Sequence, residues 1–225
     1  MSNGNEKIWI NSADDHLTEP ADIWVQAGLS ERSMKLAPYS KIENDREVYY
    51  CEGKEIFRVP MAMSEALHPP GADDLRLRMN DLDKEGIWAS VSFPSVGIWT
   101  TAMTDRAAHL ECVQAYNDWC ASEVVSVSPR LVPAGVIPLL DFDDAYRETE
   151  RLLQKGFQTV FLPTSLPNDL GYNDERWEPL WSLIEEANVP VSFHIGTGPM
   201  PKIQARGLGG AVINYFETCV PAQRT

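Results

Sequence analysis

Short apolar runs and longer amphipathic segments alternate along the chain. Each apolar run is rich in β-branched or aromatic residues and is bounded by Gly, Pro or Asn, which is the pattern of a buried strand. Five such runs predict strands over residues 7–13, 87–94, 131–138, 158–162 and 189–195. Apolar positions at helical spacing between these runs predict helices over residues 73–85, 105–126, 141–155 and 174–187.

This alternation indicates the fold class. Strands and helices that follow one another at short spacing form right-handed βαβ units with a parallel sheet. The predicted strands are continuously apolar, which fits a sheet that is covered on both faces. With 225 residues, of which 44% are hydrophobic, the chain is long enough for one sizeable core. We therefore expect a single α/β domain over residues 1–225.

One stretch breaks the rhythm, because residues 20–72 are too long for a plain βα connection. This stretch contains a short helical segment, ADIWVQA, and a hairpin-like segment, EVYYCEGKEIFRVP, which turns at Glu52 and Gly53. We interpret residues 20–72 as an insertion after the first strand, and as a lid region. In parallel barrels the loops that follow the strands form the active site.

Charge and cysteine content narrow the classes of partner. The formal net charge is −14, and such a surface repels phosphate backbones and anionic lipid heads, so we expect no nucleic acid or membrane partner. The start of the chain lacks the basic and apolar regions of a secretory signal, so the cytoplasm is the expected location. The four cysteines form no C-x-x-C pair, which favours free, buried thiols.

The stretch Asp14-Asp15-His16 follows the first predicted strand. Residues two apart on an extended chain point the same way, so Asp14 and His16 can converge on one point. A carboxylate and an imidazole are both good ligands for zinc or manganese. An equally weighted alternative is a helix start, in which Asp15 or Thr18 caps the helix near Pro20.

His194 stands at the end of the fifth predicted strand, within VPVSFHIGTG. A lone histidine at a strand end is more often a structural, hydrogen-bonding residue. The carboxyl ends of parallel strands meet at one end of the sheet, however, and that end already holds Asp14 and His16. Two strand ends that both present ligands favour the metal hypothesis.

Several other residues are candidates from their position alone. Glu19 could accept a hydrogen bond from His16, lie at the edge of the metal site and contact substrate, or begin the next helix, where a carboxylate favours the dipole. Arg58 in the insertion could pair with a substrate carboxylate, and Trp99 and Thr164 lie in loops after strands. The aromatic residues of the helices, among them Tyr116 and Trp177, are expected to pack on the sheet.

A set of linked motifs runs in order through nearly the whole chain. They are SADDHLTEPADIW, RMNDLDKEGI, AYNDWCASE, RLVPAGVIPLLD and YNDERWEPLWSLIEEANVPVSFHIGTG. In these motifs the chain resembles the amidohydrolase-related enzymes of the aminocarboxymuconate-semialdehyde decarboxylase type. Several motifs in the same order are much more specific than any one of them.

The resemblance implies a metal-dependent (β/α)8 barrel of the TIM type, of which this chain would contain about the first five β/α units. It implies that the first strand supplies two metal ligands, here Asp14 and His16, and that the fifth strand supplies His194. It also implies a histidine from a sixth strand and an aspartate ligand from an eighth. The catalytic residues are therefore expected beyond Thr225.

The function implied by the resemblance is that of a decarboxylase or hydrolase acting on a small carboxylated, often aromatic, substrate. The cofactor would be a divalent metal, with zinc favoured and manganese as the alternative, and a homodimer is expected. The competing hypothesis is a truncated or degenerate, non-catalytic barrel fragment that lacks the C-terminal metal ligand. A nucleotide-binding fold is disfavoured, because no G-x-G-x-x-G follows the first strand.

Overall fold

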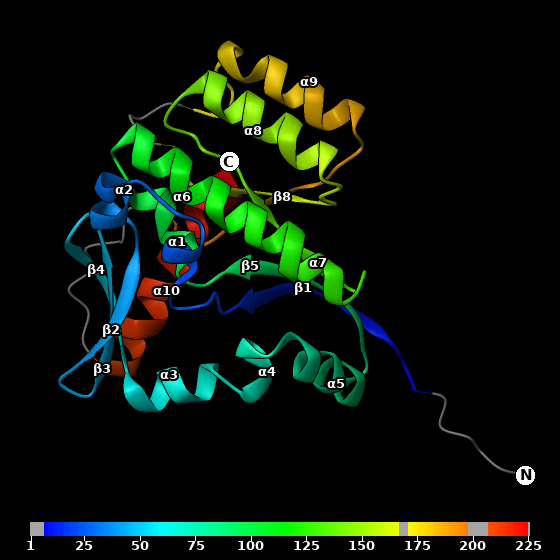
Figure 1. The fold of residues 1–225 in the computed structure, drawn as a ribbon. Helices are drawn as coiled ribbons and strands as arrows, with labels where there is room; N and C mark the ends of the chain where they lie inside the picture. The colour runs from blue at the N-terminus through cyan, green and yellow to red at the C-terminus, as the bar shows by residue number, and fades with distance from the viewer. Residues whose placement is uncertain (1–6, 167–170, 198–206, 225) are drawn as a thin grey trace, which may run out of the picture.

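The computed structural model describes residues 7–166, 171–197 and 207–224, and its centre is a layer of parallel strands (Figure 1). Two three-stranded parallel sheets have the orders β1-β5-β6 and β7-β8-β9. The strands are β1 (Ile10–Leu17), β5 (Ile87–Pro94), β6 (Leu131–Pro133), β7 (Gly135–Val136), β8 (Val160–Pro163) and β9 (Val191–His194). The prediction of an α/β fold with parallel strands is confirmed.

One short segment joins the two sheets. Ala134 lies between β6 and β7, and its N–H donates to the carbonyl oxygen of Ser92 on β5 at 2.9 Å. The N–H of the next residue, Gly135, donates instead to Thr159, which precedes β8, at 3.1 Å. The single strand predicted over residues 131–138 is therefore two short strands, because the backbone changes its hydrogen-bonding neighbour at Ala134.

The first strand differs from its prediction. We expected it over residues 7–13, but β1 runs from Ile10 to Leu17, because its pairing with β5 continues as far as Leu17 opposite Pro94. Between Ser12 and Asp15 the register shifts by one residue, which is the signature of a β-bulge. Asp14 and His16 therefore lie within the strand and not just beyond it.

The four predicted helices are found, each begun by an aspartate side chain that accepts a backbone N–H. The capping residues are Asp74, Asp105, Asp141 and Asp174. The helices of this layer are α5 (Leu75–Glu85), α6 (Arg106–Trp119) with a π-turn η2 (Cys120–Val124) and α7 (Val125–Val127), α8 (Phe142–Gln154), and η4 (Glu175–Trp177) leading into α9 (Glu178–Glu186). A further helix, α10 (Gly207–Arg224), follows.

Residues 20–72 form the segment that interrupts the βα rhythm. It comprises α1 (Ile23–Gln26), α2 (Glu31–Leu36), the antiparallel sheet β2 (Tyr39–Glu43), β3 (Arg46–Cys51) and β4 (Lys54–Pro60), then α3 (Met61–Leu67) and α4 (Pro70–Asp73). The predicted hairpin turn lies at Glu52 and Gly53, both with left-handed φ of 51° and 71°. The Glu52 carboxylate accepts the N–H groups of Thr104 and Asp105, which ties the hairpin to the start of α6. That this segment acts as a lid stays a prediction.

The main core lies between the parallel strands and helices α6, α8 and α9, which stand above β1 and β5 in Figure 1. Tyr116 and Trp177 are fully buried in this core, as expected for aromatic residues on the inner faces of helices. Asn117 is also fully buried, and its amide pairs with both the N–H and the carbonyl oxygen of Val136 at 2.9 Å. A side chain thus completes the hydrogen bonding of the short strand β7.

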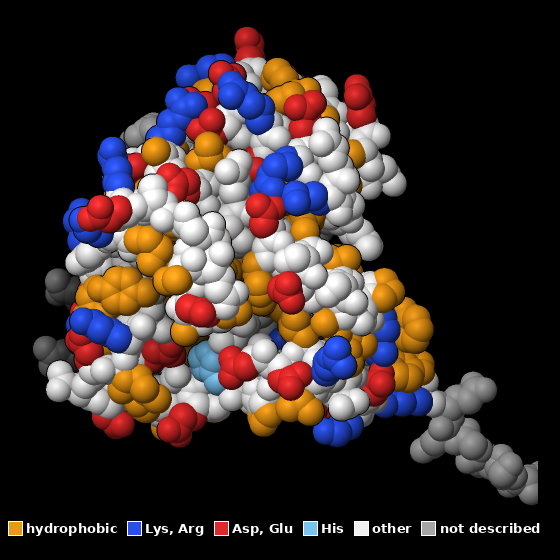
Figure 2. Space-filling model, viewed as in Figure 1, with side chains coloured by type: hydrophobic (Ala, Val, Ile, Leu, Met, Phe, Trp, Pro, Cys, Tyr) orange, Lys and Arg blue, Asp and Glu red, His pale blue; other side chains and the backbone are white. Residues whose placement is uncertain are grey.

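The surface mixes acidic and basic side chains across the face seen in Figure 2. Apolar side chains are exposed around the start of β1 and β5, among them Ile8, Trp9, Ile10 and Trp88. Among the described residues, no helix has the length and apolar character needed to cross a lipid bilayer. Cys51, Cys112 and Cys120 are free and buried thiols, as predicted.

His109 on α6 gives the fold a pH dependence that can be measured. Only 5% of the residue is exposed, and burial lowers the pKa of its imidazole to about 4. In an unfolded chain the imidazole has a pKa near 6.5, so it binds the proton at a higher pH than in the folded protein. The difference corresponds to about 3 kcal/mol of unfolding free energy. This contribution to the free energy of unfolding is fully present above pH 6.5 and is lost as the pH falls from 6.5 towards 4.

We therefore predict that His109→Gln flattens the pH dependence of stability. The difference in unfolding free energy between wild type and variant should shrink by about 3 kcal/mol from pH 7 to pH 4, because only wild type loses a buried neutral imidazole. Urea denaturation at a series of pH values measures this difference. A constant difference over that range would contradict the assignment.

Candidate metal centre

The alternation of side chains along β1 decides which residues reach the centre. Asp14 and His16 project from one face, whereas Asp15 projects from the other. The Asp15 carboxylate pairs with the buried guanidinium of Arg78 at 2.6 Å and accepts the hydroxyl of Ser90 at 2.6 Å. Asp15 is therefore an anchor between β1, α5 and β5, and neither Asp15 nor Thr18 caps α1, whose start makes no side-chain capping bond.

Backbone carbonyls orient both imidazoles. Nδ1 of His16 lies 3.0 Å from the carbonyl oxygen of Pro94, at the end of β5. Nδ1 of His194 lies 2.7 Å from the carbonyl oxygen of Ile195. Since a carbonyl oxygen can only accept, both Nδ1 atoms carry a hydrogen, and in the neutral form of each ring the lone pair lies on Nε2.

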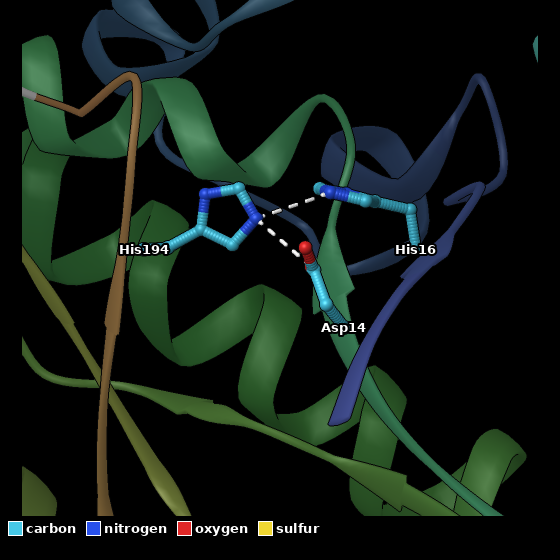
Figure 3. Close-up of side chains that lie close together, drawn as sticks. All are labelled: Asp14, His16 and His194. Carbon is cyan, nitrogen blue, oxygen red and sulfur yellow. Dashed lines mark hydrogen bonds and ion pairs between the residues drawn. The ribbon is translucent and has the colours of Figure 1, made fainter. Parts of the chain in front are cut away.

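The two Nε2 lone pairs and the Asp14 carboxylate converge (Figure 3). Nε2 of His194 lies 3.2 Å from Nε2 of His16 and 3.4 Å from Oδ1 of Asp14. All three ligand atoms lie within 4.8 Å of one another. The structure thus brings together the three residues that the sequence analysis nominated as metal ligands, from strands 178 positions apart.

Three electron-rich atoms at this separation repel one another unless a positive charge lies among them. Two neutral imidazoles with hydrogen on Nδ1 have no proton to share between their Nε2 atoms. Metal–ligand bonds of about 2.0–2.2 Å place neighbouring ligand atoms about 2.8–3.1 Å apart in octahedral geometry and about 3.3–3.6 Å apart in tetrahedral geometry. The observed 3.2 and 3.4 Å fit a small divalent cation.

Apolar rings form the floor of the centre. The ring of Phe93, on β5, lies 4.7 Å from that of His194 and 6.3 Å from that of His16, and Phe161, on β8, lies 6.1 Å from His194. Burial lowers the pKa of His16, and the neighbouring His194 lowers it further. Both effects favour the neutral imidazole that a metal requires. Asp14, by contrast, is 72% exposed at the mouth of the centre.

Glu19 lies two residues beyond β1, but it does not contact His16. Its carboxylate is 5% exposed and accepts the N–H groups of Ser95, Val96 and Gly97. Burial raises the pKa of this carboxyl, and the N–H groups oppose the rise. Both oxygens are already occupied by backbone donors, so this geometry offers a substrate no free acceptor.

The remaining candidates lie on different parts of the molecule. Trp99, on the 3-10 helix η1 (Gly97–Ala102), packs against Phe57 of the hairpin at 5.5 Å between ring centroids. Arg58 follows Phe57 on β4, is exposed and pairs with Glu55. Thr164 is buried after β8, and its N–H donates to the Thr197 hydroxyl at 2.9 Å. Of these three residues, only Trp99 packs against aromatic rings, those of Tyr49 and Phe57.

Sequence analysis missed two contributors to the geometry. Arg78 donates to the carbonyl oxygen of His16 at 2.7 Å while it pairs with Asp15, and so it fixes the strand that carries two of the candidate ligands. Its place in the RMNDLDKEGI motif was the available signal. The second contributor is the carbonyl oxygen of Pro94, which orients His16 and which no sequence pattern predicts.

Structural comparison gives the fold of similar proteins. An amidohydrolase from Mycobacterium avium subsp. paratuberculosis aligns at 19% identity over 84% of this chain and 58% of its own, with a TM-score of 0.69. A 2,6-dihydroxybenzoate decarboxylase from Rhizobium aligns at 20% identity over 96% and 61%, with a TM-score of 0.64. A dihydroxybenzoic acid decarboxylase from Polaromonas, solved with manganese and 2-nitroresorcinol, aligns at 18% identity over 96% and 60%, with a TM-score of 0.56.

The chain thus spans about three-fifths of the length of these structures. No curated protein matches its sequence. The sequence model of the amidohydrolase family matches residues 71–223, which is more than half of the chain and includes His194 and the strands β5 to β9. With the parallel strands and the cluster of potential metal ligands, this match shows that the chain belongs to the amidohydrolase family.

Proposed function

We propose that this chain contributes a divalent-metal site to an enzyme that decarboxylates or hydrolyses a small aromatic carboxylate. Of the two reactions, decarboxylation is favoured. Asp14, His16 and His194 would hold the metal. One observation carries the proposal: two imidazoles, both fixed with hydrogen on Nδ1, face each other and a carboxylate at 3.2 and 3.4 Å. A divalent cation among the three ligand atoms would stabilise that arrangement.

A cation bound there would act as a Lewis acid on a substrate oxygen, or lower the pKa of bound water to about 7. The chain's own residues set what surrounds it. Phe93 and Phe161 exclude water from below the imidazoles, which strengthens electrostatic interactions at the centre. Asp14 is exposed and faces the open side, where a small ligand can approach.

The substrate class is inferred from two observations. The structurally similar proteins of Rhizobium and Polaromonas are dihydroxybenzoate decarboxylases, and the second was solved with a nitroresorcinol inhibitor. In this chain, Tyr49, Phe57 and Trp99 form an aromatic cluster at the junction of the hairpin and η1, with centroids 5.5 to 6.1 Å apart. We propose that this cluster packs against the ring of a flat aromatic acid, because rings pack favourably on rings.

The same reasoning extends to the architecture. We propose that β1, β5, β8, β9 and the interrupted strand made of β6 and β7 represent five successive strands of an eight-stranded barrel, and that residues 20–72 overhang its mouth. The consecutive parallel order and the likeness to amidohydrolase structures support this. The metal would then lie at the carboxyl ends of the strands, where barrel enzymes hold their active sites. Both zinc and manganese suit one carboxylate and two imidazoles.

The metal site is tested by binding. Wild-type protein should bind one Mn²⁺ or Zn²⁺, and His194→Ala should weaken the affinity by more than about a hundredfold, since even partners beyond the ligands change affinity 10- to 100-fold. Competition with a chromophoric chelator gives the dissociation constants. His68→Ala is the matched control, because its Nδ1 also lies 2.7 Å from a backbone carbonyl oxygen, that of Ser64, outside the cluster. Equal affinities for all three proteins would refute the site.

The reaction is tested separately. The enzyme that contains this chain, loaded with Mn²⁺, should release carbon dioxide from 2,6-dihydroxybenzoate or a related hydroxybenzoate, and its Asp14→Asn variant should lose nearly all of this activity. Carbon dioxide release and product formation are followed together by chromatography. Hydrolysis of lactone substrates without any decarboxylation would move the assignment to hydrolase, and activity that persists after metal removal and in Asp14→Asn would contradict the proposal.

A further inference from the structure

Glu19 is buried beside the metal centre without touching it. Its Oε1 accepts the N–H groups of Ser95 at 3.1 Å and Gly97 at 2.8 Å, while Oε2 accepts that of Val96 at 2.9 Å. A carboxylate surrounded by backbone donors on both oxygens acts only as an acceptor, so it fixes the chain that surrounds it. The fixed chain is the turn that follows β5.

The turn held by Glu19 contains the peptide that orients His16. The carbonyl oxygen of Pro94 accepts from Nδ1 of His16 at 3.0 Å, and the N–H of Ser95 donates to Glu19. This carbonyl and this N–H belong to one peptide group, which is planar and rigid. By holding the N–H on one edge of this peptide, Glu19 fixes the Pro94 carbonyl oxygen on the other edge. That oxygen accepts the hydrogen on Nδ1 of His16 and so selects the tautomer.

The close approach of this turn to Glu19 is visible at Gly97. A Cβ atom at that position would lie 2.8 Å from Oε1 of Glu19 and 3.1 Å from Cβ of Pro94. It would also lie 3.3 Å from Cδ2 of the buried Tyr116, so any side chain would have to displace the carboxylate, Pro94 or this ring. The absence of a side chain at Gly97 is thus part of the same arrangement, and it provides an independent way to disturb it.

We propose that Glu19 is a positioning residue for His16: through the Pro94–Ser95 peptide it keeps hydrogen on Nδ1 and directs the Nε2 lone pair towards Asp14 and His194. This rests on the proposed metal site for its purpose, but not for its test. A carboxylate that merely anchored a loop would contribute to stability and would leave the His16 tautomer unchanged.

The tautomer can be observed directly. The chain contains four histidines, so protein labelled with ¹⁵N-histidine gives a simple spectrum of imidazole nitrogens. Wild type should show His16 with hydrogen on Nδ1. In Glu19→Gln, one acceptor oxygen becomes an amide donor that faces backbone N–H groups, so His16 should become a mixture of tautomers while His194, held by Ile195, stays unchanged.

Glu52→Gln is the matched control. Glu52 is also a carboxylate that accepts two backbone N–H groups, those of Thr104 and Asp105, but these precede α6 and do not orient an imidazole. This variant should lose stability and keep the wild-type spectrum of His16. A His16 spectrum that is the same in wild type, Glu19→Gln and Glu52→Gln would overturn the proposal.

Gly97→Ala gives a second, independent disturbance in case Glu19→Gln does not fold. It should shift His16 in the same direction, whereas Gly209→Ala should not, because nothing lies within 4 Å of a Cβ at Gly209. An unchanged His16 tautomer in folded Gly97→Ala would count against the proposal.

Metal titration separates this inference from the function beneath it. With Mn²⁺ alone as the probe, Glu19→Gln should bind about tenfold more weakly than wild type, while Glu52→Gln binds as wild type does. If wild type binds no metal, the proposed function fails, and the His16 tautomer still decides the role of Glu19. If wild type binds and Glu19→Gln binds equally well with an unchanged tautomer, the role of Glu19 fails alone.

Discussion

Two imidazole lone pairs and a carboxylate that point at one another define this molecule. His16, His194 and Asp14 place their ligand atoms 3.2 and 3.4 Å apart, and the hydrogen that might relieve the repulsion between the two imidazoles is committed elsewhere, on Nδ1 of each. A positive charge between electron-rich groups at this distance would stabilise them, and we propose that a divalent metal supplies it. The rest of the structure holds these three groups in place against their mutual repulsion.

The parallel strands and their neighbouring backbone supply that restraint. The bulge in β1 and the pairing of its end with β5 present Asp14 and His16 on one face. Arg78 forms an ion pair with Asp15 and donates a hydrogen bond to the carbonyl oxygen of His16. The end of β5 supplies the Pro94 carbonyl, and Glu19 holds the peptide that follows it. Each imidazole is therefore directed by a backbone group whose own position is fixed, which is the arrangement expected around a metal.

Residue types and periodicity were sufficient to predict part of this. Helix starts at Asp74, Asp105, Asp141 and Asp174 are local events, because one side chain caps its own chain two or three residues later, and their helices were predicted closely. The three candidate ligands were nominated because the ends of parallel strands share one side of a sheet. The predicted end of the first strand was wrong, because pairing with β5, and not local composition, decides where that strand ends. The Pro94 carbonyl and the Glu19 turn depend on contacts between distant segments, which a single sequence does not record.

Anomalous diffraction from crystals soaked in Mn²⁺ tests the central claim most directly. The account predicts a single strong peak within bonding distance, about 2.0–2.2 Å, of Asp14 Oδ1, His16 Nε2 and His194 Nε2. A peak at a different cluster of side chains, or none in crystals where those three side chains are ordered and apart from one another, would contradict it.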